Sequence, residues 1–543
     1  MHANGATVAP DRVRLADSDL WLEPEGEPDA IVAGWGGTMR DGLGVRAERG
    51  GVEVAITGGL LVDPLLGVRY ASIGISDGRI VSVGRAGNPD TMDGIDVVLD
   101  TATAVHDATG LIVTPGGVDS HVHWLSPQVA DAALAGGLTT LVIQDIGPVW
   151  NLGCNPPEML GTAWAALDAY PLNAALLVRG SSARPEPVVH SLLAGGAGLK
   201  IHEDVAAGAA QISCALDVAD AEDVQLAIHT DGLNEMLSVE ETFAAFGGRT
   251  VHAFHIEGCG GGHAPDLLAL AGRERVLTSS TNPGLPYGAG AVPEGRAMVQ
   301  AVHLLEPATR SGDAEILDLR VRSATIAAEG VLHDLGVIHM MSSDSQGMGR
   351  VGEVVRRALQ NADWMKAVRG GEGRNDNERV LRHLAKVTIN PALTHGLAGH
   401  VGALTPGRLA DAVLWAPALI GVRPQLVVKA GMAAWGESGN GNAATALSEP
   451  VRVRPQLGGV GGAPARLSIA FLAGSALDAE IPTKRPRAAV EGCRELTARD
   501  MVRNDRLGDV RVDPVTYAVT LDGEPIDAPP IERLAFSGRF LLG

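Results

Sequence analysis

The central part of the chain, residues 115–399, is predicted to form a (β/α)₈ TIM barrel beside a discontinuous β-rich domain. The pattern changes at Pro115-Gly116-Gly117, where eight apolar segments of strand length begin. Helical signals separate several of these segments, as in repeated βα units, although the pattern alone leaves a long doubly wound sheet as the alternative. The eight segments are Val118–His123, Leu141–Asp145, Ala174–Gly180, Leu199–His202, Leu226–His229, Val251–His255, Arg275–Ser279 and Val337–Asp344.

Residues 1–114 are expected to form the first part of the β-rich domain. Val52, Val54 and Ile56 alternate with polar or small residues, which is the period of a half-buried strand. Asp77-Gly78 lies between two apolar stretches and is a strong hairpin signal.

Helices and a second β-rich segment are expected after the eighth strand. Helical stretches cover Glu353–Ala367 and Glu378–Thr388, and a capping box of Ser238 and Glu241 opens an earlier helix. Strand character then returns, most clearly from Leu409 to Trp415. We expect residues 400–452 to pair with the N-terminal β-rich segment, and residues 453–543 to form a mixed α/β region.

Composition excludes several classes of function. The net charge of −21 argues against binding nucleic acid or an anionic membrane through phosphate contacts. The four cysteines form no C-x-x-C pair, and no apolar run is long enough to span a bilayer. The first residues lack the basic and apolar regions of a signal peptide. A cytoplasmic location is therefore expected.

Ionisable residues recur at the carboxyl ends of the predicted barrel strands. Barrel enzymes place their chemistry at this rim, and imidazoles with a carboxylate suit a metal of intermediate softness. Any one of these histidines could be a structural, hydrogen-bonded residue, but their shared position on successive strands indicates a site. The residues are His121, His123, Lys200, His202, His229, His255 and Asp344.

Lys200 is the unusual member of this group, because a buried ammonium beside a dication is unfavourable. The lysine can be neutral, can point away, or can be converted to an anion. Carbamylation by CO₂ gives such an anion, and its two oxygens could bridge two metals. A two-metal site can polarise a carbonyl group and activate water at neutral pH.

Long motifs around these residues resemble the α (large catalytic) subunit of urease, in the amidohydrolase superfamily. The resemblance covers nearly the whole chain. Its most specific blocks are Gly116–His123, Gly198–Asp204, His229–Asp231, Leu233–Glu235, Phe254–Gly258, Gly261–Asp266, Ser279–Pro283, Ser342–Gln346 and Gly349–Glu353.

The resemblance implies hydrolysis of urea at two nickel ions bridged by N6-carboxylysine at Lys200. His229 and His255 match the other protein ligands of one nickel. The ligands matched to the second nickel are His121, His123 and Asp344. Nickel comes from the resemblance, since the same donors would also suit zinc.

The resemblance also assigns residues that handle the substrate. His202 matches the residue that hydrogen-bonds the urea carbonyl oxygen, and Gly260 matches a backbone position lining the urea pocket. His303 matches a general acid on a mobile flap, expected at about residues 284–325. Asp204 matches the carboxylate that orients that histidine. Arg320 matches an arginine of the same network, with Arg322 as a nearby competitor.

Two departures from the family pattern bear on activity. The family has a cysteine before the flap histidine, where this chain has Val302, and the segment Val149–Met159 is shorter than the family pattern. The alternatives are a zinc-dependent cyclic amidohydrolase and a diverged, non-catalytic scaffold subunit. The resemblance further implies urease β and γ subunits, a trimer of heterotrimers and accessory proteins that deliver nickel.

Overall fold

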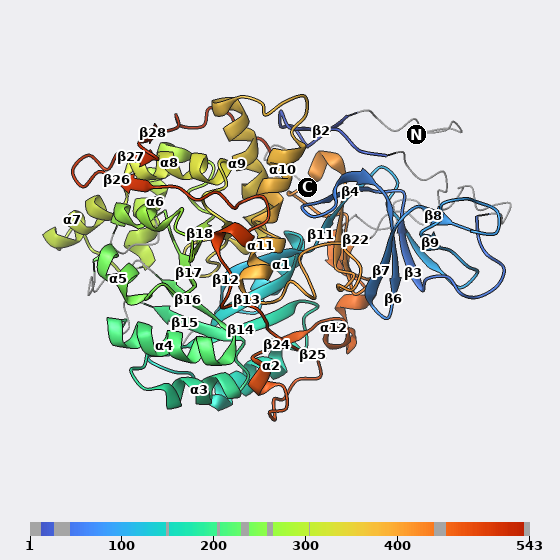
Figure 1. Ribbon diagram of the computed structural model, residues 1–543, viewed down its shortest axis with the longest axis horizontal. Coiled ribbons are helices and arrows are strands. Elements are labelled where there is room, and N and C mark those ends of the chain that lie inside the picture. The colour runs from blue at the N-terminus through green and yellow to red at the C-terminus, as the bar shows by residue number, and fades with distance from the viewer. Residues whose placement is uncertain are drawn as a thin grey trace.

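Eight parallel strands form the centre of the computed structural model, which describes residues 12–26, 44–147, 151–202, 207–229, 238–257, 264–302, 304–438 and 452–536. Each strand pairs with the next in chain order, and this arrangement confirms the predicted barrel (Figure 1). The strands are β12 (Gly117–Trp124), β13 (Leu138–Ile146), β14 (Asn173–Arg179), β15 (Gly198–His202), β16 (Gln225–His229), β17 (Val251–Phe254), β18 (Val276–Thr281) and β19 (Met340–Ser342).

The barrel closes between its last and first strands through residues that follow β19. The Asp344 N–H donates to the His121 carbonyl oxygen at 2.9 Å, and the His123 N–H donates to the Ser345 carbonyl oxygen at 3.0 Å. Strand β19 is shorter than the predicted Val337–Asp344, because the residues after Ser342 leave the ladder with β18 to bond β12. The closure therefore places Asp344 beside the two histidines of β12.

Helices cover the outside of the barrel. The capping box at Ser238 is present, with its hydroxyl accepting from the Glu241 N–H. The helix predicted over Glu378–Thr388 ends at Ala385, and Thr388 has left the helical conformation, with φ of −137° and ψ of −89°. The helices are α1 (Gln128–Ala135), α2 (Pro157–Leu167), α3 (Pro185–Leu193), α4 (Ala209–Glu222), α5 (Val239–Ala245), α8 (Ser323–Asp334), α9 (Val354–Arg369), α10 (Asn377–Ala385) and α11 (Ile389–Thr394).

A helical excursion separates β18 from α8, where the sequence predicts a flap. It contains the 3₁₀ turn η3 (Gly288–Ala291), α6 (Val292–Val302) and α7 (Ser311–Arg320). Val299, Leu317 and Val321 belong to a small apolar cluster that is separate from the main core. These helices therefore pack on one another as a unit.

The β-rich domain combines strands from before and after the barrel, as predicted. Strand β11 (Ile112–Pro115) pairs antiparallel with β20 (Ala412–Trp415), so the main sheet is built from both parts of the chain (Figure 1, blue and orange). The other strands of this sheet are β4 (Leu60–Asp63), β5 (Gly67–Tyr70), β21 (Leu426–Lys429), β22 (Met432–Ser438) and β23 (Arg452–Pro455).

A second sheet of this domain holds the predicted hairpin. Strand β6 (Ser72–Ser76) pairs antiparallel with β7 (Arg79–Gly84). Asp77 and Gly78 connect them with φ of 50° and 70°, the left-handed values that a tight hairpin turn requires. The remaining short strands of the N-terminal part are β1 (Val13–Arg14), β2 (Trp21–Leu22), β3 (Val54–Thr57), β8 (Ala86–Gly87), β9 (Val97–Val98) and β10 (Ala104–Asp107).

Asp411 joins the β-rich domain to the barrel through buried hydrogen bonds. One carboxylate oxygen accepts from Asn173 of β14 at 2.7 Å and also pairs with the Lys429 ammonium. The other oxygen accepts from the Ala430 N–H at 2.9 Å. Because all these groups are satisfied, the two domains share a specific polar contact rather than an apolar surface alone.

The last part of the chain returns to the barrel. Strand β24 (Ala470–Leu472) pairs in parallel with β14, and β25 (Arg487–Ala489) pairs with β24. A small antiparallel sheet follows, and its strands β27 and β28 lie near α8 (Figure 1, red). The elements of this region are α12 (Ala463–Arg466), β26 (Val510–Val512), β27 (Val519–Leu521) and β28 (Glu524–Ile526). Within the described ranges, no helix combines the length and apolar character needed to cross a bilayer.

Candidate metal centre

The candidate metal ligands meet at the carboxyl ends of the barrel strands. His121 and His123 lie near the end of β12, Lys200 near the end of β15, and His229 ends β16. His255 directly follows β17, and Asp344 lies two residues beyond β19. All are buried, with exposed fractions of 9% or less. The barrel thus collects these side chains from five strands, as the sequence predicts.

Three donor atoms converge at Asp344. Its Oδ1 lies 3.2 Å from His121 Nε2 and 3.0 Å from His123 Nε2, and the two imidazole nitrogens are 3.3 Å apart. Donor atoms that share one first-row metal at bond lengths of about 2.1 Å lie roughly 3.0–3.4 Å apart. The spacing of these atoms therefore fits a common metal ion.

His255 connects this group to the remaining histidines. Its Nε2 lies 3.8 Å from Asp344 Oδ2, and its ring is edge-on to His121 at 4.8 Å and to His229 at 4.6 Å. His121, His255 and Asp344 each offer a ligand atom within 4.8 Å of the others. His202 stacks on His229 with ring centroids 3.9 Å apart. His202 of β15 and His229 of β16 therefore extend the cluster beyond His121, His123 and Asp344.

Lys200 points into the same cluster. It is 1% exposed, and its Nζ lies 3.9 Å above the centre of the Phe254 ring. Phe254 also stacks with His121, with ring centroids 4.0 Å apart, so one aromatic ring contacts both the lysine and a candidate ligand. Its charge also shifts the pKa values of His121, His229 and Asp344, so the amine lies near candidate ligands of both predicted metals.

Most imidazoles in the cluster are suited to bind a metal as neutral ligands. Burial lowers the pKa of His121, His202 and His229 well below the usual value, and neighbouring cationic groups lower it further. Burial also lowers the pKa of His123, but contacts with Asp145 and Asp344 outweigh this effect and raise it to about 9. A metal at His123 must therefore displace a proton from Nε2, so its binding should strengthen as pH rises.

Two of the candidate ligands have an unusual backbone. His255 and Asp344 have φ of 51° and 54°, in the left-handed region that non-glycine residues seldom adopt. Such conformations cost on the order of 1–3 kcal/mol and persist when surrounding contacts enforce them. At Asp344 the carbonyl oxygen accepts from Gly347, Met348 and Gly349 at 2.9–3.1 Å. A tight turn therefore directs the Asp344 carboxylate toward the histidines.

The sequence prediction missed two charged residues at the same rim, Asp145 and Arg179. Asp145 Oδ2 lies 3.0 Å from His123 Nδ1, and its Oδ1 accepts from Arg179 Nη2 at 2.6 Å. Both side chains are buried. Asp145 is next to the last residue of β13 and Arg179 is the last residue of β14. The histidines were selected as ionisable residues at the carboxyl ends of barrel strands, and the same criterion would have found Asp145 and Arg179.

The predicted substrate-handling residues are only partly described. His202 is in the cluster, whereas Asp204, Gly260 and His303 lie outside the described residues. Arg320, at the end of α7, is 3% exposed. Arg322 instead lies over the Tyr517 ring at 4.3 Å, so its guanidinium is directed at the C-terminal region. Val302, at the end of α6, is 45% exposed.

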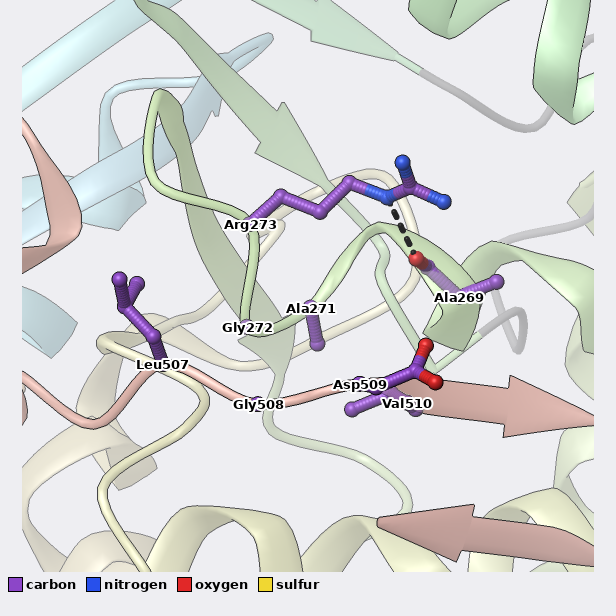
Figure 2. A pocket seen from close by; sticks show the side chains of 8 residues that line it. All are labelled: Ala269, Ala271, Gly272, Arg273, Leu507, Gly508, Asp509 and Val510. Carbon is purple, nitrogen blue, oxygen red and sulfur yellow. Dashed lines mark hydrogen bonds between the residues drawn. The ribbon is translucent and has the colours of Figure 1, made fainter. Parts of the chain in front are cut away.

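A cavity of about 390 Å³ lies elsewhere, between the 3₁₀ turn η2 (Ala264–Leu270) and the segment before β26 (Figure 2). Its lining contains none of the candidate ligands. Arg273 donates to the Ala269 carbonyl oxygen at 2.9 Å, and Asp509 accepts from Arg511 at 2.6 Å. Both charged groups thus make local contacts with neighbouring residues.

Comparisons with known proteins show the family to which the chain belongs. The amidohydrolase family matches residues 112–444, and the urease alpha-subunit N-terminal domain matches residues 1–106. Urease subunit alpha 1 of Streptomyces avermitilis is 50% identical over the full length of both chains. Urease subunit alpha 2 of Streptomyces coelicolor is 49% identical over 98% of this chain and 97% of its own.

Among solved structures, D-hydantoinase from Thermus sp. matches 70% of this chain and 95% of its own, with 15% identity and a TM-score of 0.47. The two urease proteins are much more similar to this chain in sequence, because about 50% of residues are identical along both domains. The chain therefore belongs to the urease alpha-subunit family, within the amidohydrolases.

Proposed function

We propose that the chain hydrolyses urea at two nickel ions bridged by Lys200 in its carbamylated form. Membership of the urease alpha family makes the chain the catalytic subunit of a urea amidohydrolase. The observation that carries the proposed centre is the convergence of two imidazole nitrogens on one oxygen of Asp344, at 3.0 and 3.2 Å.

The proposed ligands divide into two sets that share Lys200. His121, His123 and Asp344 would hold one nickel, and the mutual spacing of their donor atoms supports this set. His229 and His255 would hold the other, supported by the contact of their rings. When bound, nickel polarises a carbonyl group and lowers the pKa of water, which is the chemistry that hydrolysis of an unreactive amide needs.

The protein side chains bind urea and move protons in this proposal. His202 donates an N–H to the urea carbonyl oxygen, a role supported by its low pKa, which keeps the ring neutral, and by its stacking on His229. Gly260 lines the pocket through its backbone. His303 protonates the leaving nitrogen as general acid, oriented by Asp204 and Arg320. The buried position of Arg320, compared with the contact of Arg322 with Tyr517, favours Arg320 in this network.

We place the domain limits at 1–114 and 400–452 for the β-rich domain, 115–399 for the barrel and 453–543 for the C-terminal region. Residues 284–325 would act as the flap that brings His303 to the substrate. The small apolar cluster that joins η3, α6 and α7 supports such a unit, and Ile326 connects the same cluster to α8.

We infer that the chain assembles with urease β and γ subunits as a trimer of heterotrimers, and that accessory proteins deliver its nickel. We infer a cytoplasmic location, which suits a protein whose described cysteines are all free thiols.

The decisive experiment is to purify the chain with co-expressed β and γ subunits and nickel-delivery proteins. Metal analysis and ammonia release from urea are measured on the same sample, beside a sample loaded with zinc. We expect two nickel ions per chain and hydrolysis of urea only in the nickel form. Full activity with zinc, or no activity with two nickel ions bound, would contradict the proposal.

A further inference from the structure

We infer that Asp145 and Arg179 are positioning residues that orient His123 for its metal. This inference rests on the proposed function, because it assumes that a metal binds at His123. It goes beyond the ligand set, since neither residue is among the proposed ligands.

Strand register brings the three side chains together. Strand β12 pairs with β13 so that Val122 and Trp124 face Ile143 and Ile146, which places His123 opposite the end of β13 where Asp145 lies. Arg179, at the end of β14, is the register partner of Lys200. Three consecutive strands thus supply an imidazole, a carboxylate and a guanidinium, with Lys200 on the fourth.

The contacts dictate which nitrogen of His123 faces the metal site. Asp145 accepts two hydrogen bonds from Arg179 through Oδ1, from Nη2 at 2.6 Å and from Nε at 3.2 Å, so its carboxylate is ionised and can only accept. Its Oδ2 lies 3.0 Å from His123 Nδ1, which must therefore carry a proton. Nε2 then remains for the metal, and it is the atom that lies 3.0 Å from Asp344 Oδ1.

Arg179 makes this arrangement rigid. Arg179 is 2% exposed, and its Nε and Nη2 both donate hydrogen bonds to one oxygen of Asp145. These two bonds limit rotation of the Asp145 side chain. It also balances the negative charge that Asp145 brings into a buried site. Partners that hold a ligating histidine in this way typically contribute about 10–100-fold to metal affinity or activity.

The test uses the full chain with its partner subunits, stripped of metal and titrated with Ni²⁺ in equilibrium dialysis. We expect Asp145→Asn to weaken one of two Ni²⁺ sites by about 10–100-fold and leave the other intact. An amide can present its NH₂ group to Nδ1, which moves the proton to Nε2 and blocks the donor atom.

Asp334→Asn is the matched control. Asp334 is another buried carboxylate that accepts from two arginines, Arg379 at 2.8 Å and Arg369 at 2.9 Å, but it contacts none of the proposed ligands in any described interaction. Its variant should bind Ni²⁺ as the unaltered protein does. Equal affinity of Asp145→Asn and the unaltered protein at both sites would overturn the inference.

A second variant covers the case in which Asp145→Asn does not fold. Arg179→Lys keeps the charge but replaces two donors in a plane with a single ammonium, so it should weaken the same Ni²⁺ site by a smaller factor. Unchanged binding would again overturn the inference. Failure of the proposed function looks different, because the unaltered protein would then bind no Ni²⁺ or would bind it without hydrolysing urea.

Discussion

Gly349→Ala should disrupt the turn that directs Asp344 toward the histidines. A Cβ at Gly349 would lie 1.8 Å from the Ser343 carbonyl oxygen and 2.7 Å from Asn282 Oδ1. Real Cβ atoms do not approach closer than 3.0 Å, so the backbone would have to separate by at least about 1.2 Å. Neither atom can move away easily. The Ser343 oxygen belongs to the main chain, and the Asn282 side chain is held by hydrogen bonds to both the C=O and the N–H of Arg350.

The displacement acts directly on a proposed ligand. Ser343 precedes Asp344, and the Gly349 N–H donates to the Asp344 carbonyl oxygen at 2.9 Å. Overpacking of this kind costs about 1–3 kcal/mol of stability. A shift of about 1 Å at a catalytic group can cost on the order of 10²-fold in rate. We therefore expect a modest loss of thermal stability with a large loss of both metal content and turnover.

Gly399→Ala is the control, because a Cβ there meets no atom within 4 Å and the residue is exposed with an ordinary φ. Thermal unfolding, metal analysis and urea hydrolysis are measured for both variants and the unaltered protein. Gly399→Ala should match the unaltered protein in all three. If Gly349→Ala also keeps full metal content and full turnover, the proposed role of this turn is refuted.

Lys200→Ala should lose most of its metal because the bridging anion is absent; elemental analysis checks this, and two ions at full occupancy would contradict a carbamate bridge. His303→Ala should keep its metals and lose about 10²–10⁴-fold in turnover, with a smaller loss for Asp204→Asn; near-normal urea hydrolysis by His303→Ala across pH would refute its role. Iodoacetamide should leave activity intact, because Val302 offers no thiol and burial raises the pKa of every described cysteine, that of Cys493 to about 12. Mass spectrometry locates adducts, and inactivation that follows modification of Cys259 would show that this thiol controls access. The three described cysteines are Cys154, Cys214 and Cys493.

Local pattern was sufficient to predict the barrel and most of the candidate site. Each strand has a periodic apolar segment, and the polar residue at its carboxyl end is adjacent in sequence, so Lys200, His229 and His255 could be placed without knowing their neighbours. The Asp77-Gly78 hairpin and the Ser238 cap also depend only on contacts within a few residues. Such features are local in origin, and for this reason the sequence predicts them.

Contacts between distant segments were decided by the tertiary structure. The short range of β19 and the position of Asp344 follow from bonds to β12, more than 200 residues earlier in the chain. The contact of His123, Asp145 and Arg179 depends on the register of three strands, and register is set by how the whole barrel packs. The sequence by itself determined which chemical groups this protein brings to its site, whereas only the closed barrel decided which of their atoms face one another, because those distances arise from packing across the fold.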